Sequence, residues 1–411
     1  MREMKNSGVA WIGDVPENWK VLRNKNLIYE INEKCTDTTD LPLLSVSEYY
    51  GVAPRADKIH DGQIVSRAET FEGYKICHQD DVVMNIMLAW KRAQAVSSFN
   101  GIVSPAYCVY RKKNNSKLDM TFFNYLIRSD LYISVFKRFS TGIIDSRLRL
   151  YPEKFLALHS HVPPTYEQHK IAKHLNKACN NIENLINNQE QQIEKLKQYK
   201  QSLITEVVTK GLNPDVPMKD SGIEWIGKIP NNWQIVRFRF IAKITTGNQD
   251  TQNATADGNY PFYVRSPIVE KSDTYTFEGP GILMAGDGAG AGRVFHLVDG
   301  KYAVHQRVYR FYDFKFIVPE LLKLFLETQF STVMDYGSAK TTVPSVRLPM
   351  IQDFPVCIPT KAEQMKMITY LRDKIKKIDS LIAIKQEKIN KLNDYKKSLI
   401  YEYVTGKREV C

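Results

Sequence analysis

Several patterns that mark particular protein classes are missing from this 411-residue sequence. Its longest apolar stretch, VVMNIMLAW at 82–90, falls well short of the roughly 20 residues that span a membrane, and its start has no signal-peptide pattern. No C-x-x-C pair or nearby histidine accompanies its six cysteines, Cys35, Cys77, Cys108, Cys179, Cys357 and Cys411. We therefore expect a cytoplasmic protein with reduced thiols, without a disulfide framework, a metal site or a membrane contact.

Motifs for catalysis are missing as well. There is no G-x-S-x-G, no methyltransferase tetrapeptide such as N-P-P-Y, and His159 and His161 lie close in sequence without cysteine partners. The glycine run GDGAGAGR at 286–293 lacks the Lys-Ser or Lys-Thr of a phosphate loop, and the alternating RVFHLV that follows favours a strand where a dinucleotide fingerprint opens a helix. The run is either a tight turn or bulge or a ligand-facing loop. We expect neither an active site nor a bound cofactor.

Charge is unevenly distributed along the chain. The net charge of +12 indicates a polyanionic partner, but residues 359–411 hold 13 Lys and Arg against seven Asp and Glu, whereas residues 213–358 hold 15 of each. In that neutral segment, nucleic-acid contact requires local clustering of cations or help from another chain.

The sequence consists of two halves that begin with similar segments and end with similar segments. WIGDVPENW at 11–19 returns as WIGKIPNNW at 225–233, and residues 167–209 match residues 363–405 in register. Each half is therefore a variable middle between a constant start and a constant finish. Four of the five tryptophans stand in the repeated starts, at Trp11, Trp19, Trp225 and Trp233. We expect them to pack each start against its core, with ligand contact as the alternative.

The repeated finish has a heptad pattern. One heptad position in the first copy is held by Ala172, Cys179, Ile186, Ile193, Lys200 and Val207, and the second copy repeats the pattern from Ile368 to Tyr403 without proline or glycine. Two similar stripes in one chain predict an intramolecular antiparallel coiled coil of roughly 60 Å, with the middles at opposite ends and with Gln189 and Lys385 as polar breaks that fix the register. Two separate solvent-bridging helices are the alternative.

The middles have short β-rich runs around Gly and Asp turns, and we expect one helix in each, at 119–139 and 318–336, followed by a loop that ends in arginine. The predicted class is α+β: two similar mixed α/β domains separated by two long helices in an antiparallel coiled coil, with a pseudo-two-fold internal repeat. The predicted boundaries are a first domain at 1–162, a central helix at 163–212, a second domain at 213–358 and a C-terminal helix at 359–411.

The order of domain, helix, domain, helix, with W-I-G-x-x-P-x-N-W opening each half and the E-Q of PTYEQ and PTKAEQ opening each helix, resembles the specificity subunit of type I restriction-modification systems. GIVSPAY and GDGAGAGRVF resemble phrases of its recognition domains. The resemblance implies a non-catalytic subunit that reads a bipartite site in double-stranded DNA. It implies docking of two adenine methyltransferase subunits and, through them, of restriction subunits. S-adenosylmethionine, ATP and Mg²⁺ are then expected on those partners. Alternatives are the recognition half of a fused restriction-methylation enzyme and a coiled-coil scaffold without sequence reading.

Aromatic residues interleaved with Arg and Lys beside glycine, as in AWKRAQ and HQRVYRFY, are typical of phosphate and base-edge contact, although solvated basic strands have the same pattern. For the first half-site we predict Lys91, Arg92 and Arg147 as DNA-binding residues. For the second half-site we predict Arg293, Arg307, Lys340 and Arg347.

Overall fold

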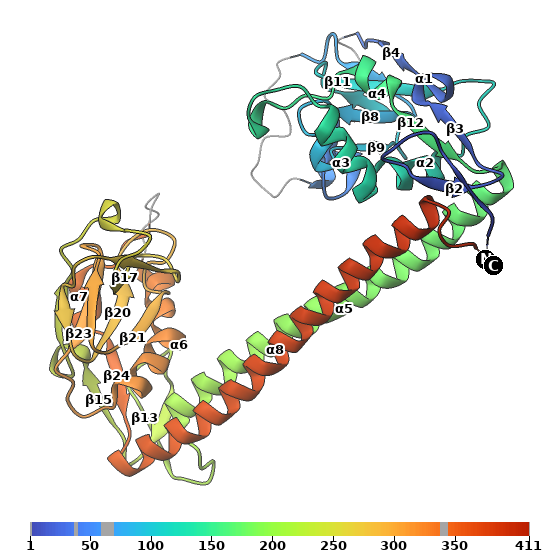
Figure 1. The fold of residues 1–411 in the computed structure, drawn as a ribbon. Helices are drawn as coiled ribbons and strands as arrows, with labels where there is room; N and C mark the ends of the chain where they lie inside the picture. The colour runs from blue at the N-terminus through green and yellow to red at the C-terminus, as the bar shows by residue number, and fades with distance from the viewer. Residues whose placement is uncertain (1, 37–39, 59–69, 338–343, 411) are drawn as a thin grey trace. The chain divides into compact units, whose positions relative to one another are not determined.

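The computed structural model describes residues 2–36, 40–58, 70–337 and 344–410. These residues form two compact units, Met1–Gln189 with Glu387–Cys411 (unit 1) and Glu190–Gln386 (unit 2). Each unit holds one mixed α/β domain and a portion of both long helices, α5 (Thr165–Lys210) and α8 (Lys361–Val404) (Figure 1). We describe the two units separately.

The domain of unit 1 is organised on an antiparallel sheet of order β4-β11-β8-β9, namely Ile28–Ile31, Tyr107–Lys112, Val82–Asn85 and Gln94–Val96. The other strands pair in twos: β1 with β2 (Met4–Asn6, Asp14–Pro16), β3 with β12 (Lys20–Arg23, His159–Val162), β5 with β6 (Leu44–Ser47, Gly51–Pro54) and β7 with β10 (Lys75–Cys77, Gly101–Val103). Its described residues also form the helices α1 (Asn24–Leu27), α2 (Met120–Ile127), α3 (Asp130–Phe139) and α4 (Pro152–Ala157).

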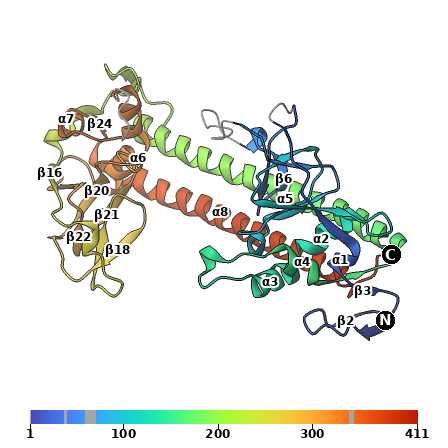
Figure 2. The same cartoon turned by 90° about the horizontal axis from the view of Figure 1, so that it is seen from above.

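Unit 2 repeats this plan and adds a second sheet. Its counterpart sheet has the order β16-β23-β20-β21, namely Lys243–Thr246, Val308–Tyr312, Gly281–Ala285 and Phe295–Val298. The added sheet has the order β18-β17-β22-β19, namely Val269–Ser272, Tyr260–Tyr263, Lys301–Val304 and Phe277–Glu278. The remaining elements are β13 (Met218–Asp220) with β14 (Lys228–Pro230), β15 (Gln234–Arg237) with β24 (Pro355–Ile358), α6 (Pro319–Gly337) and α7 (Leu348–Gln352). Figure 2 shows α6 beside β20 and β21.

The prediction of one helix at 119–139 is wrong. The segment is broken into α2 and α3, because Arg128 ends the first helix and Ser129 adopts the extended backbone of an N-cap, while its hydroxyl donates to the Leu126 carbonyl at 2.7 Å. The hydroxyl thus satisfies a carbonyl at the end of α2, as capping side chains do. The second predicted helix is present as the single helix α6.

The long helices run antiparallel within each unit, as predicted. In unit 1, Glu183 of α5 pairs with Lys396 of α8 at 2.5 Å, and His174 lies against Tyr403 with ring centroids 4.5 Å apart. In unit 2, Lys200 pairs with Asp379 at 2.7 Å. The seam residues Lys396 and Lys200 therefore have carboxylate partners at the rim, which lowers the cost of placing a charge in an apolar seam, whereas the seam residue Lys385 donates to the Gln192 side chain.

The repeated tryptophan motif packs against the core in both units, which confirms the packing prediction. Trp19 and Trp233 are fully buried, and Trp225 stacks on Phe354 with ring centroids 5.6 Å apart. Each buried tryptophan also receives the end of a long helix: Gly406, after α8, lies against Trp19, and Gly211, after α5, lies against Trp233. In each unit the tryptophan motif thus forms a packing site, here called the tryptophan seat, for the end of the long helix that belongs to the other half of the sequence.

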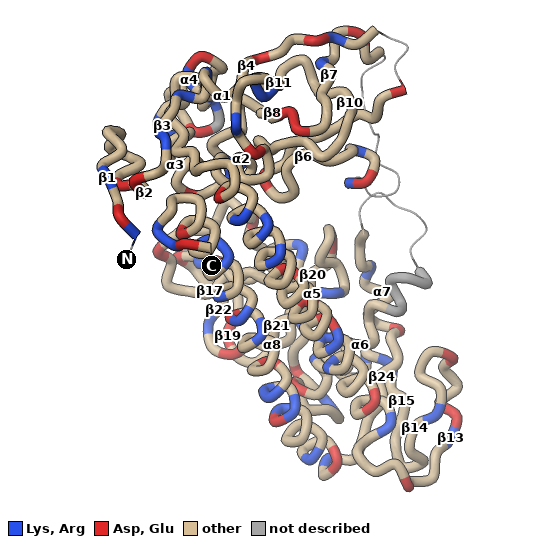
Figure 3. The backbone as a smooth tube through the Cα atoms, turned by 90° about the vertical axis from the view of Figure 1, so that its right-hand side faces the viewer, with Lys and Arg blue, Asp and Glu red and all other residues tan. Residues whose placement is uncertain are grey.

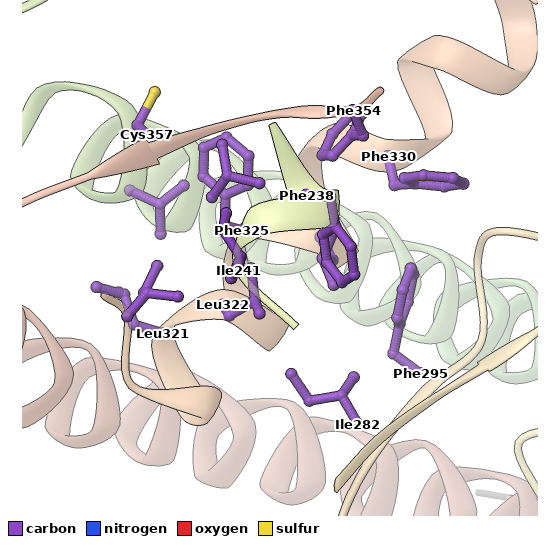
Figure 4. Close-up of a cluster of buried hydrophobic side chains, with 14 of the residues drawn as sticks. Phe238, Ile241, Ile282, Phe295, Leu321, Leu322, Phe325, Phe330, Phe354 and Cys357 are labelled. Atoms are coloured by element: carbon purple, nitrogen blue, oxygen red, sulfur yellow. The ribbon is translucent and has the colours of Figure 1, made fainter. Parts of the chain in front are cut away.

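Figure 4 shows the core of unit 2, where Phe238, Phe325, Phe330 and Phe354 gather with Ile241 under the sheet. Residues of both long helices, among them Val207 and Leu371, belong to the same buried cluster. The helices therefore share a core with the domain, and their inner faces are buried by it as well as by each other.

The repeated Glu-Gln pair at the helix starts has a structural role. Gln168 donates to the carbonyls of Pro163 and Lys117 and accepts from the backbone N–H of Asp119. Gln364 makes the same three bonds, to Pro359, Phe316 and Val318. Both amides are buried, and each satisfies backbone groups that would otherwise be orphaned. This ties the first turn of each long helix to its domain.

Candidate nucleic-acid interface

The loop that follows the central strand occupies the same place in both units. In unit 1, Ile86 follows β8 and its carbonyl accepts from Leu150 N at 2.9 Å; in unit 2, Gly286 follows β20 and its carbonyl accepts from Val346 N at 2.8 Å. Most of the predicted cations lie on or beside these two loops, so we describe them as the candidate interface.

In unit 2 the loop carries a carboxylate between two arginines. Asp287 Oδ1 lies 3.1 Å from Arg265 Nη1, and Asp287 Oδ2 lies 3.1 Å from Arg307 Nη1. The side chains of Arg265 and Arg307 are 45% and 63% exposed, whereas that of Asp287 is 15% exposed. The arginines therefore reach solvent while their carboxylate partner is sheltered beneath them.

The glycines of GDGAGAGR explain how this loop packs. A Cβ on Gly286 would lie 2.9 Å from the Arg307 carbonyl oxygen, and a Cβ on Gly290 would lie 2.4 Å from the Arg265 carbonyl oxygen. The missing side chains let the loop approach the backbones of both arginines. The loop ends in the strand β21, which confirms that it does not open a helix.

The other cations predicted for unit 2 surround the same loop. Arg293 closes it, donating its backbone N–H to Gly290 at 3.0 Å, and Arg347 stands exposed at the N-cap of α7, next to Val346, which bonds Gly286. Lys340 lies outside the described residues. Three of the four predicted residues are thus brought to one loop cluster.

In unit 1 the corresponding cluster is built on Trp90. The ammonium groups of Lys91 and Lys137 each lie 5.0 Å from the centre of its ring, within the range of a cation–π contact. Lys137 also pairs with Asp145 at 3.0 Å, and Asp145 opens the short 3₁₀ helix that ends in the exposed Arg147. Lys91 and Arg147, predicted independently, therefore lie in one group of loops.

Arg92 is held differently. Its Nε donates to the Arg128 carbonyl at 3.1 Å and its guanidinium is ion-paired with Asp130, while partial burial lowers its pKa. Its backbone has φ +66°, a left-handed value that is unusual for arginine. These contacts commit the Arg92 side chain to joining the loop to α3.

Sequence reasoning missed Arg265, Asp287 and Lys137. Lys137 is followed by Arg138 in the last turn of α3, a basic pair that was visible in the sequence. Arg265 had no comparable signal, because β17 and β20 are neighbours of this loop only in the folded unit. Among the described residues, no group of three or more His, Cys, Asp or Glu is placed to hold a metal ion, and no helix is long and apolar enough to cross a membrane.

Two domains that present arginine and lysine on matching loops, each resting on part of a coiled coil, are typical of a nucleic-acid-binding protein. The family described as type I restriction modification DNA specificity domain matches residues 230–394. The MjaVIII specificity subunit of a type I restriction enzyme from Methanocaldococcus jannaschii is 24% identical over 96% of this chain and 94% of its own length. The EcoDI specificity subunit of Escherichia coli is 28% identical over 38% of this chain and 33% of its own.

The fold is that of a chain from a solved type I restriction-modification system, with a TM-score of 0.70 and 15% identity over 95% of this chain and 98% of that one. The chain is therefore similar over nearly its whole length to a specificity subunit of a type I restriction enzyme, and residues 230–394 match the specificity-domain family.

Proposed function

We propose that this chain reads double-stranded DNA at a bipartite site, one half-site per domain, and has no catalytic activity of its own. The observation that carries the proposal is the presence of exposed cations at the loop after the central strand in both domains: Lys91 lies on that loop in unit 1, and Arg307, in the turn before β23, is ion-paired with Asp287 of that loop in unit 2. Loop cations on a rigid sheet are suited to contacting phosphates and base edges. The subunit would act in the cytoplasm, where its DNA is.

We propose further that two adenine methyltransferase subunits dock on the long helices. On each long helix, an exposed leucine and an exposed tyrosine occupy the same heptad position, one residue before a residue of the Ala172–Val207 or Ile368–Tyr403 stripe. They are Leu185 and Tyr199 on α5, and Leu381 and Tyr395 on α8. The corresponding residues are exposed almost equally, at 48% and 47% for the leucines and 55% and 54% for the tyrosines.

In an antiparallel pair these positions of the two helices lie on the same side. Leu185 therefore shares a side with Tyr395 in unit 1, and Leu381 with Tyr199 in unit 2. The domains contact the other side, through Asn176 (bonded to Tyr125 at 2.8 Å) and Arg372 (paired with Glu320 at 2.6 Å). Two equal apolar patches in a repeated chain are suited to two copies of one partner.

Charge along the helices does not form a single-sign surface: Figure 3 shows Lys and Arg alternating with Asp and Glu on both. Restriction subunits would join through the methyltransferases, and S-adenosylmethionine, ATP and Mg²⁺ would be bound by those partners. A fused enzyme's recognition half would instead show methyl transfer by the chain alone, and a scaffold would show no sequence preference.

The test is to purify the chain alone and with its methyltransferase subunits, then to map methylated adenines in a randomised duplex library. We expect no methyl transfer by the chain alone and adenine methylation at a two-part motif by the complex. Methyl transfer by the isolated chain, or methylation without a two-part motif, overturns the proposal.

The docking sites are tested by stoichiometry. We expect the pair Leu185→Ser with Tyr395→Ser, or the pair Leu381→Ser with Tyr199→Ser, to reduce the bound methyltransferase subunits from two to one, as measured by native mass spectrometry. The exposed Asn187→Ser is the matched control on the same helix. Retention of two subunits by both double variants would show that docking uses another surface.

A further inference from the structure

The cluster of Arg265, Asp287 and Arg307 in unit 2 is more ordered than general attraction to DNA requires. Both carboxylate oxygens of Asp287 are used, one by each guanidinium, at 3.1 Å. Each arginine is bonded through one Nη, which leaves its remaining N–H groups exposed at the surface. Because the carboxylate faces both arginines from the sheltered side, their free edges are aimed outward.

The backbone of Arg307 is held in place as well as its side chain. The Arg307 N–H donates to Nδ1 of the buried His305 at 2.9 Å, and its carbonyl accepts from Gly286 N at 2.9 Å. Asp287 itself forms an antiparallel bridge with Ser345. Much of the conformational entropy that a free arginine loses on binding is therefore already lost in the folded protein.

We propose that Arg265 and Arg307 each read a guanine in the major groove of the half-site bound by unit 2, with Asp287 as the residue that positions both. The proposal rests on the proposed DNA-reading function and names its chemistry in this domain. The O6 and N7 atoms of guanine accept two parallel hydrogen bonds from one guanidinium edge, and this is the commonest base-specific contact of arginine.

Phosphate contact is the competing use of an arginine, and the observations favour base reading over it. Phosphates are bound through charge, and Asp287 reduces the summed charge of the trio from two to one, which weakens a general phosphate site. Fixed orientation contributes little to phosphate attraction but is required for discrimination between base edges.

The experiment uses the complete complex with its methyltransferase subunits and the methylated-adenine library. We expect guanine at two positions of the half-site read by unit 2. Arg307→Ala should relax one of them and Arg265→Ala the other, each by about 10- to 100-fold in preference, the range for a bidentate contact. Asp287→Asn should weaken the preference at both positions together, with unchanged thermal stability. The half-site read by unit 1 is the internal control and should not change.

Two further arms separate the outcomes. Substituting 7-deazaguanine at one position removes N7, so it should weaken methylation by the wild-type complex but not by the variant that lacks the arginine for that position. Arg372→Ala, an exposed arginine of unit 2 that pairs with Glu320, is the matched control and should leave base preference unchanged.

A uniform loss of affinity for all sequences in the arginine variants, with the slope of log K against log salt reduced by about one per arginine, would identify phosphate contacts and overturn the proposal. A two-part motif without guanine in the second half also overturns it, while leaving the proposed function intact. Absence of any two-part motif would instead refute the proposed function itself.

Discussion

The two mixed α/β domains share the strand pairing of their central sheets and differ in the loops at the ends of those strands. Strand pairing aligns Tyr107 with Asn85 in unit 1 and Val308 with Ala285 in unit 2. By this register, Asp287 corresponds to Met87 and Arg307 to Ala106. Unit 2 thus has a charged cluster where unit 1 has small and apolar side chains.

This difference indicates that specificity is separable from stability in such domains. The central strands beneath both loops are buried, whereas Met87 is 38% exposed and the Arg307 side chain 63% exposed. Exchanging the exposed side chains of these loops changes the groups that face solvent without removing contacts of the buried strands. The two domains also differ at a buried position of the strand that precedes each long helix. In unit 1, His161 of β12 pairs with Val21, and in unit 2, Cys357 of β24 pairs with Ile235 at the corresponding position.

The largest expected effect tests whether the two tryptophan seats are equivalent. Trp19→Ala and Trp233→Ala should each cost about 3 to 5 kcal/mol, because each removes a fully buried indole. Hydrogen exchange should increase mainly in the unit that carries the change. Equal loss of protection in both units after either substitution would mean that the chain unfolds as one cooperative body.

The next effect tests the contrast between His161 and Cys357. Burial lowers the pKa of His161 from 6.5 to about 4, although a 2.7 Å bond between Nε2 and the Val404 carbonyl opposes the shift. Between these pKa values the unfolded chain binds a proton that the folded chain does not, so stability is full above pH 6.5 and is lost as pH falls toward 4. The loss is about 3 kcal/mol at most.

His161→Cys reproduces the residue of unit 2, where burial raises the pKa of the Cys357 thiol to about 12 and keeps it neutral throughout this range. The variant should therefore lose less stability than the wild type between pH 7 and pH 4.5, as measured by urea unfolding. Identical pH dependence in the two proteins would place the titration elsewhere, since their carboxylates are the same.

A smaller effect on stability is expected from replacing the glycines that follow the long helices. Both have left-handed backbones, with φ +72° at Gly406 and +80° at Gly211. Alanine at Gly211 should cost about 1 kcal/mol, because its nearest neighbour, a carbon of Trp233, would lie at 3.3 Å. Alanine at Gly406 should cost about 2 to 3 kcal/mol, because the Pro16 ring would lie at 2.4 Å and must shift. Equal melting temperatures for the two variants would contradict this order.

The smallest expected effect concerns the spacing between the two proposed DNA half-sites. It leaves both domains unchanged. Four residues inserted after Lys200 lengthen a continuous helix by roughly 6 Å. Since a duplex step is about 3.4 Å, the preferred gap should grow by one or two base pairs, with each half-site's bases unchanged. Methylation mapping reads the gap, and thermal melting controls for the shifted seam. An unchanged gap in a folded, active complex would show that linkers set the spacing.

The sequence by itself determined the plan of this protein. Heptad spacing from Ala172 to Val207 and from Ile368 to Tyr403 predicted two long helices, because apolar residues every three and four positions form one stripe that must be buried. The repeated start and finish predicted two similar halves. These inferences succeed because they depend on local spacing along one element.

Only the tertiary structure decided which residues meet. Arg265 and Arg307 are separated in sequence by the five strands β18 to β22 and the glycine run. They share Asp287 because the ends of β17 and β20 and the turn after β22 converge in the folded unit. Gly406 reaches Trp19, and Gln168 reaches the backbone of Asp119, for the same reason. Contacts between distant segments depend on how whole elements pack to bury their apolar faces, and no periodicity within a single element encodes that packing.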